Sequence, residues 1–215
     1  MTTTIEPITY QGQFGEFTIT AHDRRTVVIY RGALAIAAAC FAIGVGLVLS
    51  QPSDGMLQLL SPLYTVFCLA LGVSLIYIHI YMEVLHRVLQ AFWLIGCGAS
   101  LAIAHVYPEP LALTIYHQPL TLLGVGFVFA AVTGIYFKEA FCFNRLETKV
   151  LTPLVPSLLL GHLLGWLPLN LEQSLLGVWA GLFVVFALRK VIQPIPPDIG
   201  DKSVFDYLHQ QQKNA

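Results

Sequence analysis

The chain has 215 residues, of which 56% are hydrophobic and only 11% are charged, whereas ordinary soluble domains have about 45–50% and about 25%. A soluble protein needs polar side chains to cover its surface, so this composition excludes a soluble globular domain. The formal net charge is −1 and the basic residues form no stripe, so we expect no nucleic-acid partner.

Long charge-free apolar runs follow one another along the chain. A run of roughly 18 or more such residues is typical of a transmembrane helix, because hydrocarbon offers no hydrogen-bond partner to a bare backbone. A transmembrane β-barrel would instead show alternating segments of about ten residues, which are absent. We therefore predict an all-α, polytopic membrane protein with six transmembrane helices in a compact bundle, at about 27–50, 59–82, 88–106, 119–137, 150–167 and 174–188.

These helices form a predicted transmembrane domain over residues 25–192, between an amino-terminal tail (1–24) and a carboxyl-terminal tail (193–215). The stretch 111–118 is apolar but follows two prolines. We expect an interfacial or re-entrant segment there.

Both tails contain short patterned stretches. From Ile8 to Thr20 apolar residues alternate loosely, which is compatible with a short hairpin or with a polar coil. In the other tail, Ser203 is a candidate N-cap for a short amphipathic helix.

The loops between the six predicted spans differ in charge. All eleven Lys and Arg residues lie in the two tails, in the loops on the same side, or at the adjoining ends of the spans. The opposite loops contain Asp54, Glu109 and Glu172 and no basic residue. Because basic loops stay on the cytoplasmic side of a membrane, we predict that both termini face the cytoplasm or stroma.

Two GxxxG patterns, which let helix backbones approach closely in membranes, occur in the fifth and sixth spans. The first consists of Gly161 and Gly165, and the second of Gly177 and Gly181. Both lie at similar depth when counted from the turn near Asn170, so we expect spans five and six to pack as a tight hairpin.

The end of the second span offers a candidate metal site. His79, Glu83 and His86 are spaced i, i+4 and i+7, which places them on one face of a continuous helix. Imidazole and carboxylate together suit several transition metals, and Glu139 is the other carboxylate at a matching depth. A di-metal centre would need a second Glu-x-x-His, which the sequence lacks. The alternative is a solvated loop with an interfacial ion pair.

His162 is a polar residue within the fifth span, flanked by glycines. Such residues are costly in a bilayer and often functional, and this imidazole is a candidate ligand for haem or chlorophyll. The alternative is a packing role with a hydrogen bond to a neighbouring helix. No catalytic triad, nucleotide-binding loop or protease motif is present, so we predict no catalytic residue and assign no cofactor.

The longest internal loop, 138–149, combines charges of both signs with aromatic residues. This composition favours a docking surface for a partner or for lipid headgroups, while an interfacial elbow is the alternative. The carboxyl-terminal tail lies on the same side, so we expect loop and tail to form one displaceable partner surface. Its predicted members are Lys138, Phe141, Phe143, Arg145, Lys149, Phe205, Tyr207 and Leu208.

Four stretches carry a resemblance to a known family. They are YQGQFGEF (10–17), PLTLLGVG (119–126), YFKEAFCFNRLE (136–147) and IPPDIGDKS (195–203). Through them the chain resembles, from Tyr10 to Leu208, the uncharacterised integral membrane proteins of domain of unknown function 2301. The resemblance implies an oxygenic photosynthetic host, and hence a plasma or thylakoid membrane. Because the family carries no established activity, the resemblance implies no catalytic residue.

The leading hypothesis for function is a non-enzymatic accessory or assembly protein that binds a larger membrane complex within the lipid bilayer. One alternative is a small-solute carrier or channel, for which His162 is nearly the only polar residue at mid-depth. The other is a metal-, haem- or chlorophyll-binding protein that uses His79, Glu83, His86 or His162.

Overall fold

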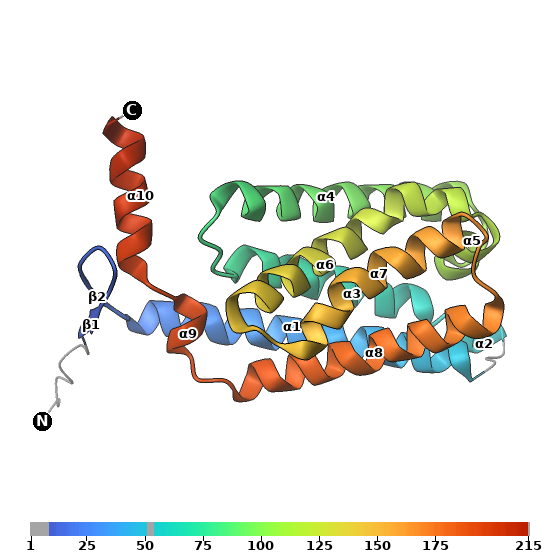
Figure 1. Cartoon of the computed structure of the whole chain (residues 1–215). Helices are drawn as coiled ribbons and strands as arrows, with labels where there is room; N and C mark the ends of the chain where they lie inside the picture. Colours follow the sequence, from blue (N-terminus) through green and yellow to red (C-terminus); the bar gives the residue numbers. More distant parts are fainter. Residues whose placement is uncertain (1–8, 51–53, 215) are drawn as a thin grey trace, which may run out of the picture.

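The computed structural model describes residues 9–50 and 54–214 (Figure 1). Residues 1–8 of the expected amino-terminal tail and Ala215 lie outside the described part. In chain order the elements are β1 (Thr9–Gln11), β2 (Glu16–Thr18), α1 (Ala21–Leu49), α2 (Asp54–Leu57), α3 (Leu60–Tyr77), α4 (Glu83–Val106), α5 (Leu111–His117), η1 (Pro119–Thr121), α6 (Leu122–Phe143), α7 (Leu146–Leu163), α8 (Leu169–Ile192), α9 (Pro196–Ile199) and α10 (Lys202–Asn214).

The long helices α1, α3, α4, α6, α7 and α8 run alongside one another as a compact bundle (Figure 1). α1 packs against α3 and α8, α6 packs against both α4 and α7, and α7 packs against α8. Over the described ranges, five helical segments are long and apolar enough to cross a membrane: Ala21–Leu49, Gly55–Tyr77, Glu83–Val106, Pro119–Phe143 and Leu169–Ile192. The prediction of an all-α integral membrane protein built as a helical bundle is confirmed.

α7 is the long helix that this set leaves out. It carries Glu147 and Lys149 near its start and His162 in its last turn, and Pro153 and Pro156 lie inside it. The expected span 150–167 therefore corresponds to a real helix of the bundle, but composition does not mark that helix as membrane-crossing.

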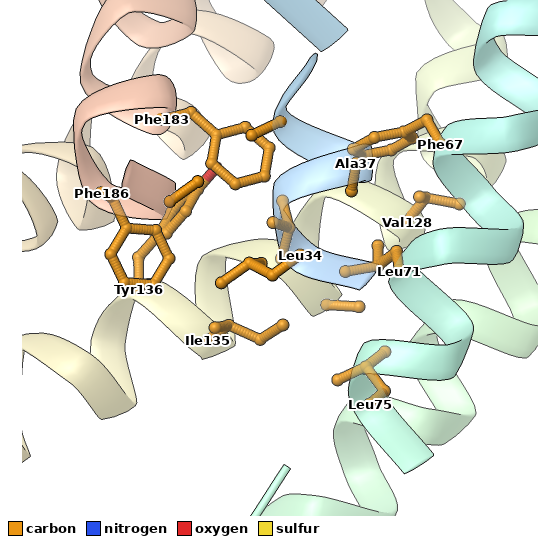
Figure 2. Close-up of a cluster of buried hydrophobic side chains, with 14 of the residues drawn as sticks. Leu34, Ala37, Phe67, Leu71, Leu75, Val128, Ile135, Tyr136, Phe183 and Phe186 are labelled. Atoms are coloured by element: carbon orange, nitrogen blue, oxygen red, sulfur yellow. The ribbon is translucent and has the colours of Figure 1, made fainter. Parts of the chain in front are cut away.

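The core lies where α1, α3, α6 and α8 meet. Leu34 of α1, Leu71 of α3, Ile135 and Tyr136 of α6 and Phe183 of α8 gather there without exposed surface (Figure 2). Because lipid is as apolar as these side chains, van der Waals packing holds such a core together more than exclusion of water does.

The helix boundaries differ from the predicted spans mainly near charged residues. The helix expected at 59–82 ends at Tyr77, and α4 then begins at Glu83 rather than at residue 88. α6 continues beyond residue 137, through Lys138 and Glu139, to Phe143. The predicted span 119–137 stopped before Lys138, whereas Lys138 and Glu139 are paired inside the protein, so α6 continues past them.

Both tails lie at one end of the bundle, called here the tail end (Figure 1). β1 and β2 form an antiparallel hairpin in which Tyr10 is opposite Phe17, so the hairpin alternative holds. α10 runs across the bundle axis instead of continuing it (Figure 1). The expected short helix is therefore present. Its N-cap is Asp201 and not the predicted Ser203, because the Asp201 carboxylate accepts from the Ser203 N–H at 2.9 Å.

The opposite end of the bundle, called here the far end, contains the stretch 111–118. Leu111–His117 forms the short helix α5, and the turn η1 then leads into α6.

Candidate functional site

A cluster of ionised side chains lies inside the bundle at the tail end. Glu139 of α6 is fully buried and accepts hydrogen bonds from Nζ of Lys138 at 2.9 Å and from Nζ of Lys190 at 2.7 Å. The Tyr30 hydroxyl of α1 donates to the same carboxylate at 3.4 Å. A buried carboxylate is tolerated only when it is paired and hydrogen-bonded, and Glu139 has three partners.

Lys190 of α8 connects Glu139 to a second carboxylate. Its side chain has no exposed surface and also donates to Asp198 in α9. Its ammonium lies 4.2 Å from the centroid of the Phe143 ring, which adds a cation–π contact. One lysine thus holds α6, α8 and α9 together.

Asp198 ties α9 to α1. Arg31 donates to one oxygen of its carboxylate, Oδ2, through Nε at 2.7 Å and approaches the same oxygen through Nη2 at 2.6 Å. The same guanidinium donates to the Gln193 and Pro194 carbonyls. Five buried residues therefore form one ion network: Arg31, Lys138, Glu139, Lys190 and Asp198.

Further charges border the ion network. Arg189 donates to Glu147 at 2.8 Å, and Arg145 donates to the Gln193 side chain. Arg145 Nη1 and Glu147 Oε1 lie 3.8 Å apart, and neither atom has a hydrogen-bond partner. Within the ion network and these bordering residues, basic side chains outnumber acidic ones, five to three.

A second set of contacts, called here the clasp, joins the hairpin to the tail. The N–H of Gln13 donates to Asp201 at 2.7 Å, and the N–H of Phe14 donates to the Ser203 hydroxyl at 3.0 Å. The Phe14 and Tyr207 rings stack with centroids 4.0 Å apart. Hydrogen bonds from Ser203 and Gln13 hold the pKa of Asp201 below its usual value, so this carboxylate stays ionised at neutral pH.

The clasp is also fixed to the segment between α3 and α4. The Tyr81 hydroxyl accepts from the N–H of Asp201 at 2.5 Å, and its ring stacks on Phe205 with centroids 4.8 Å apart. Gly200 has φ 73° and ψ −164°, a conformation open essentially to glycine alone. A Cβ at this position would collide with Tyr81.

The structure separates the residues of the predicted metal site. His79 lies in the non-helical segment 78–82, so it does not share a helix face with Glu83 and His86. Glu83 pairs with Arg87 at the surface, 3.7 Å away, and a ring nitrogen of His86 lies 2.6 Å from the Leu75 carbonyl oxygen. Burial lowers the pKa of His79. In the part of the chain that the structure describes, no three His, Cys, Asp or Glu side chains gather as a metal site.

The glycines of the two GxxxG patterns do not face one another. A Cβ at Gly161 would meet Leu167, and one at Gly177 would meet Leu49 of α1. Around Gly165, which ends α7 with φ 64°, and around Gly181, the space is open. α7 and α8 do form a hairpin, but the glycines of the two patterns do not contact one another across it.

His162 lies in the last turn of α7, toward the far end, and has protein partners. Its Nδ1 is 2.9 Å from a carboxylate oxygen of Glu172 in α8, and its ring stacks on Tyr116 with centroids 5.5 Å apart. This arrangement corresponds to the packing alternative, in which the imidazole bonds to a neighbouring helix.

The eight residues of the predicted partner surface lie at three places. Lys138, Phe143 and Arg145 are wholly or largely buried beside or within the ion network. Phe141 and Lys149 are exposed near the junction of α6 and α7. Phe205, Tyr207 and Leu208 belong to α10 and the clasp.

Sequence reasoning did not single out Tyr30, Arg31 or Lys190 as site residues. It named Asp198 as an acidic residue of the tail that could pair with the loop 138–149, whereas its partners are Arg31 and Lys190. Arg31 opens the first predicted span and Lys190 follows the sixth, so both resembled interfacial residues. A usable signal was present for Arg31: a charge with apolar neighbours on both sides, one turn inside a span, requires a partner within the protein.

The comparisons with known proteins identify the family. The family model described as "Uncharacterized integral membrane protein (DUF2301)" matches residues 73–207, which is more than half of the chain, and the chain belongs to this family. Neither the curated proteins nor the solved structures contain a match. Three of the four stretches that carry the resemblance meet at the tail end: 10–17 in the clasp, 136–147 in the ion network, and 195–203 in both.

Proposed function

We propose that this protein is a non-enzymatic accessory or assembly protein, which binds a larger membrane complex through its tail end. The observation that carries the proposal is the clasp. It fixes two short elements, the hairpin and α10, relative to each other outside the bundle. The packing of the bundle does not need this arrangement, so we assign it to binding.

The clasp holds apolar side chains on a protruding surface. Phe14 is 47% exposed although it stacks on Tyr207, and Leu208 is 39% exposed. Rigid aromatic side chains that are ordered in advance are favourable contact points, because little conformational entropy is lost when a partner binds. This surface, called here the platform, consists of Phe14, Tyr207 and Leu208.

A pull-down in mild detergent tests the proposal. We expect the wild-type protein to bring down a defined membrane complex, and the double variant Phe14→Ala, Leu208→Ala to lose it. The matched control is Leu101→Ala on α4, since Leu101 is exposed but lies outside the platform. If the double variant still brought down the same complex, the platform would not be the binding surface.

The buried charges favour a second candidate, a carrier or channel. Ionisable residues inside a membrane bundle commonly mark ion or proton pathways, and the ion network brings together charges from four helices. Proteoliposomes with an internal pH-sensitive dye test this function. Proton flux that Glu139→Gln abolishes would support it, and equal flux through both proteins would exclude the network as a pathway.

The membrane is proposed to be a plasma or thylakoid membrane, on the strength of the family resemblance. Fractionation of the native membranes followed by immunodetection distinguishes the two.

A further inference from the structure

A groove lies between α6 and α7, along the halves of these helices that are farther from the tail end. Its volume is about 370 Å³, and residues that line it include Leu123, Gly126, Ala130, Thr133, Pro156 and Leu160. Leu123 and Leu160 are more than half exposed on helices of a membrane bundle. The groove therefore opens toward the hydrocarbon of the bilayer and continues the lipid-facing surface.

The lining offers no free polar side chain to a ligand. The Thr133 hydroxyl already donates to the Phe129 carbonyl at 2.7 Å, and the other lining side chains are hydrocarbon. The contacts available are dispersion contacts, each weak but numerous along a close-fitting chain. This chemistry favours a saturated hydrocarbon occupant.

The shape of the groove restricts the occupant further. On α6 it extends from Leu122 to Thr133, which corresponds to a length of about 16 Å of helix. A groove of that length, lined by hydrocarbon side chains of both helices, matches one extended acyl chain lying along it.

Gly126 accounts for part of the open space. A Cβ added there would meet no atom within 4 Å, whereas a Cβ at Gly96 would collide with Val128 of α6. Gly96 therefore permits helix contact, while Gly126 leaves room that no part of the described chain fills.

We propose that this groove binds one acyl chain of a phospholipid from the leaflet at the far end. The site is independent of the platform, which lies at the other end of the bundle. It gives the protein a resident lipid that fills the groove between α6 and α7.

Photolabelling in liposomes tests this proposal. Protein is reconstituted with phosphatidylcholine that carries a diazirine in its acyl chain, irradiated, digested and analysed by mass spectrometry. We expect labelling of peptides from 122–133 and 155–163 to exceed that of other lipid-facing helices several-fold. Gly126→Phe, which fills the groove, should reduce this labelling several-fold.

The matched control is Gly98→Phe on α4, because the space around Gly98 is also open and this residue does not line the groove. It should leave the labelling unchanged. Ala130→Phe serves as a second groove-filling variant should Gly126→Phe lower the melting temperature. Even labelling of all lipid-facing helices, unchanged labelling in both groove variants, or a cross-linked protein across the groove would each overturn the proposal.

Discussion

Glu139 and Lys190 have no exposed surface, and each is surrounded by charged partners. Taking two charges out of water costs several kcal/mol per ion, which close pairing offsets only when every partner is present. The ion network satisfies this condition with three cations and two anions from α1, α6, α8 and the tail helix α9. Its stability should therefore depend steeply on each member.

We predict that Glu139→Gln destabilises the bundle by about 3–5 kcal/mol, the range for breaking a buried ion pair. The amide keeps the size of the side chain but leaves Lys138 and Lys190 without their shared counter-ion. Thermal unfolding in detergent measures the change. Glu83→Gln is the control, because its pair with Arg87 is exposed on both sides and should contribute less than about 1 kcal/mol. Similar melting temperatures for the two variants would contradict the prediction.

A second prediction at this scale concerns Gly200. Gly200→Ala should release α10, because the added Cβ displaces Tyr81 and the backbone conformation excludes alanine. Faster tryptic cleavage after Lys202 would report the release. Gly165→Ala is the matched control: its φ is also positive, at 64°, but the space around it is open. It should cost about 1–2 kcal/mol for the left-handed backbone without exposing Lys202. Equal cleavage of both variants would show that Tyr81 does not hold the tail.

At the scale of elements, the carboxyl-terminal tail consists of two parts with different roles. Residues 194–203 close the bundle, because Asp198 completes the ion network and Ile199 packs against Val27 in a small buried cluster. The part after Ser203 contacts the hairpin and Tyr81 but no buried charge among the described residues. The sequence suggested one displaceable tail, whereas the structure divides it at the clasp.

This division predicts different outcomes for two truncations. Removal of the chain after Ser203 should leave the melting temperature of the bundle nearly unchanged while abolishing binding of the partner. Removal after Pro197 also deletes Asp198. Arg31 then loses its carboxylate partner and Lys190 keeps only Glu139, so the truncated protein should accumulate less in the membrane. Melting temperature and membrane yield measure both effects. Equal stability of the two truncated proteins would show that Asp198 is dispensable.

The long helices could be predicted from local pattern because hydrocarbon forces an apolar segment to be helical, whatever its neighbours. Pairing between distant residues leaves no such local trace. Arg31 and Asp198, for example, are separated by 167 positions. The spacing argument for the predicted metal site assumed a continuous helix, whereas the chain leaves the helix at residue 78, so His79 does not lie on one helix face with Glu83 and His86.

At the scale of the whole molecule, the clasp constrains the number of times that the chain crosses the membrane. The hairpin and α10 are in contact, so we predict that both tails lie on one side of the membrane and that the chain crosses it an even number of times. Five helical segments meet the hydropathy requirement, and α7, which runs beside α6 and α8, is our candidate for the sixth crossing. The basic residues gather at the tail end, which favours a cytoplasmic or stromal position for both tails.

We therefore predict six crossings with both termini inside, and cysteine labelling tests this topology. In a background with the four native cysteines replaced by serine, Glu109→Cys should react with a membrane-impermeant maleimide in sealed cells. Its side chain is half exposed and lies between α4 and α5 at the far end. Lys149→Cys, near the start of α7 at the tail end, should react only after permeabilisation, which also serves as the control for its accessibility.

If α7 did not cross, the far-end residue Asn170 would lie on the same side as Lys149. Asn170→Cys should instead react like Glu109→Cys, and labelling of Lys149→Cys in sealed cells would overturn the predicted topology.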